Sequence, residues 1–173
     1  MRHSKFIYPR LAISFASILV ATLLSYGASA FAGPIEKLPG RWTGYGQITL
    51  LNGASERVKC IATYFLKKGM RANRKNINHN LRCASTSYRI DATANLTVKT
   101  RSIAGEWRER TYSTGGAASG RITPSGLRLS IKGDGFQALF AVRTTSRCRQ
   151  SIEISPLQGL DIKKLTIALI RGC

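Results

Sequence analysis

Hydrophobic and polar residues alternate along most of the chain after position 40. In the segment 40–51, Trp42, Ile48 and Leu50 share one face, and Arg41 and Thr43 share the other. A repeat of two residues is typical of a half-buried strand, because successive side chains of a strand point to opposite faces. Asn52-Gly53 supplies the positive backbone angles of a hairpin turn. We therefore predict a strand, a tight turn and a returning strand over 56–67.

The same pattern continues to the C-terminus. The segment 88–99 alternates most regularly, and shorter alternating segments follow, separated by turns rich in glycine, proline or serine; Gly115-Gly116 is interpreted as one of these breaks. We count eight to ten strands and predict no helix. This predicts an all-β fold, a single antiparallel meander that closes as a small barrel, with a β-sandwich as the alternative. Closure is favoured because it removes exposed sheet edges.

The first 32 residues have the pattern of a secretory signal peptide. Three basic residues precede an apolar run over 11–24, which is too short to span a bilayer comfortably. Cleavage is expected after Ala32, with Ala30 as the alternative. We predict a signal peptide over 1–32, an extended leader over 33–39 and a barrel domain over 40–173. The predicted location is the periplasm or the extracellular space, and no later apolar run is long enough to cross a membrane as a helix.

Four cysteines in an exported chain predict two disulfides. Three pairings are open, and we favour Cys60–Cys83 and Cys148–Cys173, because each joins segments that are close in the sequence of a meander. A metal site is disfavoured, since no Cys-x-x-Cys pair occurs and His79 is the one histidine after the predicted signal peptide. We expect no metal and no cofactor.

The chain is strongly basic. It has 27 Lys and Arg against 8 Asp and Glu; three of the cations lie in the predicted signal peptide, which leaves a net charge of +16 for the remainder. Such a field attracts acidic partners. The segment 67–80 breaks the alternation and is interpreted as a polar surface loop or hairpin tip. We predict that it binds anions through five residues: Lys67, Lys68, Arg71, Arg74 and Lys75.

Outward positions on neighbouring strands could extend this basic surface; they are Arg57, Lys59, Arg82, Arg89 and Lys99. The expected partner is an anionic glycolipid or another polyanion, because several arginines can fork onto phosphate groups. A solvated loop that keeps the protein soluble explains the same residues equally well. Nucleic acid is a disfavoured partner, since the chain carries an export signal and no motif of stacking aromatic residues.

Gly40-Arg41-Trp42 at the head of the first strand resembles the G-x-W signature of the calycins, which include the lipocalin, fatty-acid-binding and avidin barrels. The resemblance implies that Trp42 packs across one end of a barrel, under a late basic residue. Arg171 stands at the position expected for that residue, and Arg143 is the alternative. Gly105-Glu106-Trp107 matches the same pattern. The chain is also similar to small exported proteins of unassigned function in Gram-negative bacteria.

No recognisable catalytic set follows the predicted signal peptide. His79 lies in the predicted polar loop and is interpreted as solvated, and Glu106 and Glu109 are three residues apart, which places them on opposite faces of a strand. We therefore predict a non-enzymatic binding protein for an anionic envelope component or a small-molecule ligand. An inhibitor of a secreted hydrolase, which inserts a loop or its leader into a cleft, is the alternative. An enzyme is a third hypothesis, which a pocket holding Glu109 beside Trp107 and a second carboxylate would favour.

Overall fold

The computed structural model describes residues 33–69 and 74–173, with the backbone alone at Phe136. The predicted signal peptide and Arg71 lie outside the described residues. Ten strands follow one another along the described chain: β1 (Gly40–Leu50), β2 (Ser55–Lys68), β3 (Arg74–Ala84), β4 (Arg89–Lys99), β5 (Ser102–Glu109), β6 (Thr114–Thr123), β7 (Gly126–Gly133), β8 (Phe136–Thr144), β9 (Arg149–Ile154) and β10 (Ile162–Ile170).

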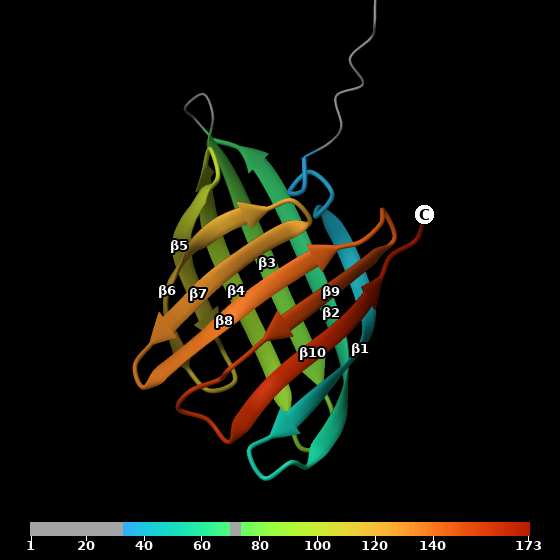
Figure 1. Cartoon of the computed structure of the whole chain (residues 1–173), viewed down its shortest axis with the longest axis vertical. Helices are drawn as coiled ribbons and strands as arrows, with labels where there is room; N and C mark the ends of the chain where they lie inside the picture. The colour runs from blue at the N-terminus through green and yellow to red at the C-terminus, as the bar shows by residue number, and fades with distance from the viewer. Residues whose placement is uncertain (1–32, 70–73) are drawn as a thin grey trace, which may run out of the picture. The chain divides into compact units, whose positions relative to one another are not determined.

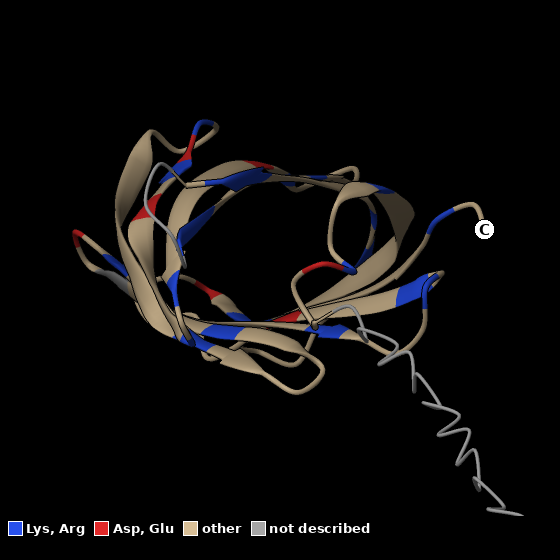
Figure 2. Cartoon of the chain, turned by 90° about the horizontal axis from the view of Figure 1, so that it is seen from above, with Lys and Arg blue, Asp and Glu red and all other residues tan. Residues whose placement is uncertain are grey.

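The ten strands form one closed antiparallel barrel. Each strand pairs with the next along the chain, and β1 closes the ring by pairing with β10, from Thr43 opposite Ile170 to Leu50 opposite Ile162. The ring of strands is visible in Figure 1 and, along the barrel, in Figure 2. The predicted all-β meander is confirmed, and the sandwich alternative is wrong. Within the described residues, no helix has the length and apolarity that a membrane crossing requires.

Side chains alternate between the interior and the outside of this barrel, as the period of two predicts. On β2, Val58, Cys60, Ala62 and Tyr64 are all buried, while Arg57 and Lys59 are exposed. The same alternation fills the interior with side chains from every strand, and the glycine at position 53 turns the first hairpin with a φ of 88°. The core is therefore the inside of the barrel.

The two ends of the barrel differ, and we name them by what they hold. The capped end comprises the leader, the turns β4–β5, β6–β7 and β8–β9, and residues 171–173. The cavity end comprises the turns β1–β2, β3–β4, β5–β6 and β7–β8 and the connection 155–161. Since consecutive strands run in opposite directions, turns alternate between the two ends along the chain.

The segment 67–80 is not the predicted surface loop. β2 continues to Lys68 and β3 begins at Arg74, so most of this segment is paired strand. Its asparagines face outward, where the Asn78 amide donates to Asn95 Oδ1 at 2.5 Å, while Ile77 and His79 are buried. Buried and outward positions alternate through this segment, but the outward positions hold asparagine, a residue type that is common in turns.

Gly115 and Gly116 lie inside β6, so the predicted break there is also wrong. Close approach of neighbouring backbone requires glycine there, because a Cβ at Gly115 would clash with Trp107 O and one at Gly116, opposite Trp107 in the β5–β6 register, would clash with Lys132 O. On the next strand, a Cβ at Gly133 would stand 3.2 Å from the Trp107 ring. The indole thus extends over two glycine-bearing strands and donates its Nε1–H to Lys132 O at 3.1 Å.

The leader is folded rather than extended. Backbone bonds from Glu36 N to Gly33 O and from Leu38 N to Ile35 O turn the chain back on itself, and Ile35 and Leu38 are buried in the core. The leader therefore covers one end of the barrel with apolar side chains. This corrects the prediction of an extended leader.

Two disulfides join Cys60 to Cys83 and Cys148 to Cys173, the pairs favoured from the sequence. Cys60 and Cys83 stand directly opposite each other on β2 and β3 and point into the barrel. Cys148 lies in the β8–β9 turn, so its bridge fastens the end of the chain to the capped end. Disulfides of this kind are consistent with an oxidising, exported compartment.

Trp42 and Arg171 meet at the capped end. Trp42 is fully buried and donates its Nε1–H to Leu38 O at 2.9 Å, and the Arg171 guanidinium lies 4.3 Å from the centre of its ring. Arg171 also donates to Pro39 O and to Arg147 O, both at 2.6 Å. One side chain therefore connects the leader, the first strand and the β8–β9 turn. Arg143, the alternative partner, is exposed on β8.

Replacing Arg171 by alanine should lower the free energy of unfolding by about 2–3 kcal/mol, because two hydrogen bonds from a charged donor and a cation–π contact are lost. Urea unfolding of the oxidised protein measures this change. Arg143→Ala is the matched control and should stay within about 0.5 kcal/mol of the wild type. Equal stability of the two variants would contradict the role given to Arg171.

Candidate functional site

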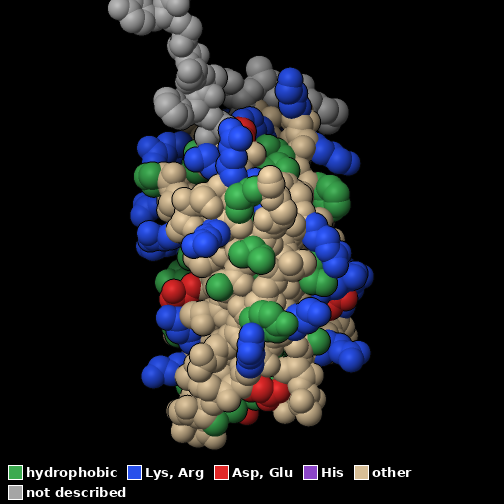
Figure 3. All heavy atoms as spheres, turned by 90° about the vertical axis from the view of Figure 1, so that its right-hand side faces the viewer, with side chains coloured by type: hydrophobic (Ala, Val, Ile, Leu, Met, Phe, Trp, Pro, Cys, Tyr) green, Lys and Arg blue, Asp and Glu red, His purple; other side chains and the backbone are tan. Residues whose placement is uncertain are grey.

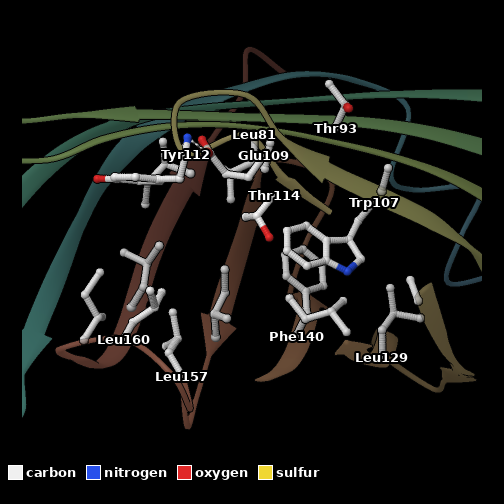
Figure 4. A pocket seen from close by; sticks show the side chains of 18 of the residues that line it. Leu81, Thr93, Trp107, Glu109, Tyr112, Thr114, Leu129, Phe140, Leu157 and Leu160 are labelled. Atoms are coloured by element: carbon white, nitrogen blue, oxygen red, sulfur yellow. Dashed lines mark hydrogen bonds between the residues drawn. The ribbon is translucent and has the colours of Figure 1, made fainter. Parts of the chain in front are cut away.

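A cavity of about 350 Å³ lies inside the barrel and extends to the loops of the cavity end. Its walls are mostly aliphatic and aromatic, as the close view in Figure 4 shows for Leu129, Phe140 and Leu157. Tyr112 of the β5–β6 turn and Leu160 of the 155–161 connection line its outer part and are exposed themselves. Cavities of this size and composition are typical of small-molecule sites.

Small inward side chains on two nearby strands leave part of the interior unfilled. Ala92 and Ala94 of β4 and Ala118 of β6 line it, at positions where larger side chains would fill the interior. Sequence alone left open whether the many inward alanines and glycines meant a tight barrel or a hollow one. The register of the closed ring decides this, because it determines which positions face each other across the interior.

A buried polar strut crosses the interior between the cavity and the capped end. Tyr64 of β2 donates its hydroxyl to Gln150 Oε1 of β9 at 2.9 Å, and the Gln150 amide donates to Thr144 Oγ1 at 3.3 Å. Burial raises the pKa of the Tyr64 phenol far above its ordinary value, so the hydroxyl keeps its proton. Tyr64, Gln150, Trp42 and the leader do not line the cavity.

His79 lies between this strut and the cavity. Its ring stacks on Tyr64 with 4.3 Å between centroids, and it also lines the cavity. It is buried, which corrects the interpretation as a solvated loop histidine, and its Nε2 has no hydrogen-bond partner among the described residues. Burial lowers the pKa of the imidazole from 6.5 to about 3, so the ring is neutral at physiological pH.

Glu109 ends β5 at the outer part of the cavity. Its two oxygens accept backbone N–H bonds from Asp91 at 2.7 Å and from Tyr112 at 2.6 Å, so the carboxylate orders the start of β4 and the β5–β6 turn. Figure 4 shows Glu109 beside Tyr112, with Thr114 nearby. Glu106, on the opposite face of the same strand, is exposed.

The cavity contains the residues that would favour an enzyme. Trp107 and Glu109 line it together with a second carboxylate, Asp134. However, both Glu109 oxygens already accept backbone hydrogen bonds. These bonds hold the carboxylate in place, and each oxygen keeps a second lone pair, so Glu109 can still interact with a polar or charged group of a ligand.

The predicted anion-binding residues that the structure describes lie at the capped end. Lys67 stands opposite Asn76, and Lys68 stands opposite Lys75, where β2 ends and β3 begins. Lys75 is partly neutralised, because it forms an ion pair with Glu36 of the leader. Lys67 and Lys68 are exposed, and Arg74 is half-buried. Of the predicted extensions, Lys99 joins this group, since it stands opposite Arg74. The others lie further along the barrel, Lys59 about 25 Å from Lys67.

Charge is divided unevenly between the ends of the barrel. The described loops and termini of the capped end, with the outer three residues of every strand, hold fourteen Lys and Arg against one acid, Glu36. The corresponding residues of the cavity end hold eight Lys and Arg against six acids. Cations also occur along the sides, as Figure 3 shows for one face. The excess of positive charge is therefore greatest at the capped end, away from the cavity.

The described residues hold no group of His, Cys, Asp and Glu that could bind a metal ion. No protein-family model matches the sequence, and no curated protein matches it either. Among solved structures, the S-type phycobiliprotein lyase CPES from Guillardia theta is similar, with a TM-score of 0.53 and 12% identity over 80% of this chain and 90% of that chain. At this identity the likeness shows a common fold. It is consistent with a calycin-like barrel and assigns no family.

The neutral, buried His79 should make stability depend on pH. The unfolded imidazole binds a proton below pH 6.5, and the folded one only near pH 3, so stability is complete above pH 6.5 and falls as the pH drops through this window. At pH 4.5 this costs the folded state about 3 kcal/mol.

Urea unfolding of the wild type and of His79→Phe at pH 7.5, 5.5 and 4.5 tests this expectation. The phenyl ring keeps an aromatic stack on Tyr64 and cannot be protonated. The wild type should therefore lose stability relative to the variant as the pH falls, while the carboxylates act equally in both. Parallel curves would show that His79 is not buried in its neutral form.

Proposed function

We propose that this chain is an exported binding protein that holds a small, largely apolar molecule inside its barrel. The observation that carries the proposal is the cavity of about 350 Å³, whose walls are mostly apolar and which opens among the cavity-end loops. A pocket of this kind binds ligands by burying their apolar surface. The rigid frame is pre-formed, because the disulfide between β2 and β3 and the Tyr64–Gln150 strut both fasten the barrel around it.

Binding without turnover explains the site better than catalysis does. Glu109 is engaged by two backbone amides, and the neutral His79 is stacked on Tyr64. The name of the structural neighbour describes a lyase, but a likeness of 12% identity carries the fold and not an activity. Export is supported by the signal-peptide pattern over 1–32 and by the two disulfides.

The neutral fluorescent probe N-phenyl-1-naphthylamine should bind the protein at one site, with a rise in fluorescence. Ala118→Leu fills the cavity from β6 and should weaken this binding at least tenfold. The control is Ala117→Leu, one residue along the same strand, because Ala117 is exposed outside the barrel and its replacement should leave the affinity unchanged. Absence of probe binding, or equal effects of the two substitutions, would contradict the proposal.

A second candidate function is the binding of an acidic glycolipid or polyanion at the capped end. The observation that favours it is the excess of fourteen cations over one acid there. Cations at a surface attract anionic lipids with about 1 kcal/mol each at physiological salt. Since the cavity opens at the other end, the two functions can coexist on one barrel.

Changing Lys67, Lys68, Arg74 and Lys99 to glutamine should weaken binding to vesicles that carry an acidic glycolipid at least tenfold and flatten its salt dependence. Co-sedimentation over a range of NaCl concentrations measures this, with heparin as the soluble polyanion. The control replaces four exposed cations at the cavity end, Arg89, Arg108, Lys132 and Lys163. Equal losses in both variants would mean that net charge alone acts, and unchanged binding would remove the capped end from consideration.

A further inference from the structure

We propose that the cavity selects an amphiphile whose polar end is a cation, such as an alkylammonium group, and discriminates against the matching carboxylate. The proposal rests on the function proposed for the cavity and names the chemical class of its ligand. It runs opposite to what the net charge of the chain suggests, since a basic protein attracts anions by default.

The charged residues that line the cavity are all acidic. Glu109 and Asp134 line it, and no Lys or Arg does so among the described residues. This is unexpected in a chain with 27 cations and 8 acids. An anionic ligand would therefore find no opposite charge in the cavity and two like charges at its outer part. A cationic group would find only opposite charges among the described charged residues that line the cavity.

Glu109 is a buried carboxylate without a counterion. It is 8% exposed, and no Lys or Arg nitrogen in the described chain lies within 4 Å of its oxygens. The two backbone amides satisfy hydrogen bonds but leave the net charge in place. Burying an ion without an opposite charge is costly, so a ligand cation beside Glu109 would recover part of that cost.

The surroundings of Glu109 suit an ammonium group. Tyr112, whose backbone N–H donates to the Glu109 carboxylate, and Thr114 line the same cavity as Glu109, and Figure 4 shows their side chains there. An aromatic face attracts cations, and a hydroxyl oxygen accepts a hydrogen bond from an N–H. Tyr112 and Asp134 lie on exposed turns, so the polar end of the ligand would stay near water while its apolar body enters the barrel.

The inner end of the cavity offers no positive charge to an anion entering in the opposite direction. His79 is the basic side chain there, and its ring stacks on Tyr64 with its Nε2 buried and unpartnered. Burial lowers its pKa to about 3, so the imidazole carries no charge at neutral pH. A carboxylate at this depth would be desolvated without an ionic partner. Both orientations of an anionic amphiphile are thus disfavoured.

Three ligands of equal chain length test the selectivity: octylamine, 1-octanol and octanoate at pH 7, each used to displace N-phenyl-1-naphthylamine from the wild-type protein. We expect octylamine to bind at least tenfold more tightly than octanoate, with 1-octanol between them. Equal or tighter binding of octanoate would overturn the inference and leave the proposed function standing. If the probe itself does not bind, the proposed function fails instead.

Charge-matched variants locate the effect. Glu109→Gln should weaken the binding of octylamine about tenfold and change the affinity for 1-octanol by less than twofold. Glu106→Gln, with the same charge change on the outer face of β5, should change neither. Asp134→Asn, in an exposed turn, should weaken the binding of octylamine severalfold, and Asp161→Asn is its control. If Glu109→Gln does not fold, the comparison of these two variants tests the inference. Equal effects of Glu106→Gln and Glu109→Gln would attribute selectivity to net charge and overturn the inference.

Discussion

The pairing of β1 with β10 is the constraint on which the rest of this structure depends. Each of the other strand pairs joins neighbours in sequence, whereas this one brings the two ends of the domain together, from Thr43 opposite Ile170 onward. The closing pair also brings Arg171 over Trp42, within reach of Pro39 O and Arg147 O. Leader, first strand and chain end therefore become ordered at the same place. Without closure, the meander would expose two strand edges and the leader would have no surface to cover.

The hollow lies at one end because the sizes of the inward side chains differ between the two ends. At the capped end the interior receives large side chains, with Trp42, Leu38 and Tyr64 among those buried almost completely. The Tyr64–Gln150 strut marks the limit of this packed region. Beyond it the inward positions include Ala92, Ala94 and Ala118, so the same ring of strands encloses space that its own side chains do not fill. Packing at one end thus stabilises a barrel that keeps a cavity at the other.

The sequence predicts the strands well because alternation is a local property. It fails where a local signal is misleading: Asn76, Asn78 and Asn80 suggest a turn, yet they form the outer face of a strand whose inner face holds Ile77 and His79. Gly115-Gly116 likewise suggests a break and instead lies inside β6, where neighbouring backbone oxygens leave no space for a Cβ. The leader was misjudged because the two prolines hide the buried pair Ile35 and Leu38. The cavity could not be predicted, since it depends on which small residues of β4 and β6 face the rest of the ring.

Net charge is therefore a poor guide to what the interior of this barrel accepts. The outside is basic, above all at the capped end, where Glu36 is the one acid among the described residues and is already paired with Lys75. Inside, Glu109 and Asp134 are the charges that line the cavity. Solvent and salt screen the outer field over about 10 Å, whereas charges at an apolar wall act on a ligand at short range through a less polarisable medium. Under the functions proposed above, Glu109 and Asp134 therefore decide which ligand the cavity takes, and the outer cations decide which surfaces the protein approaches.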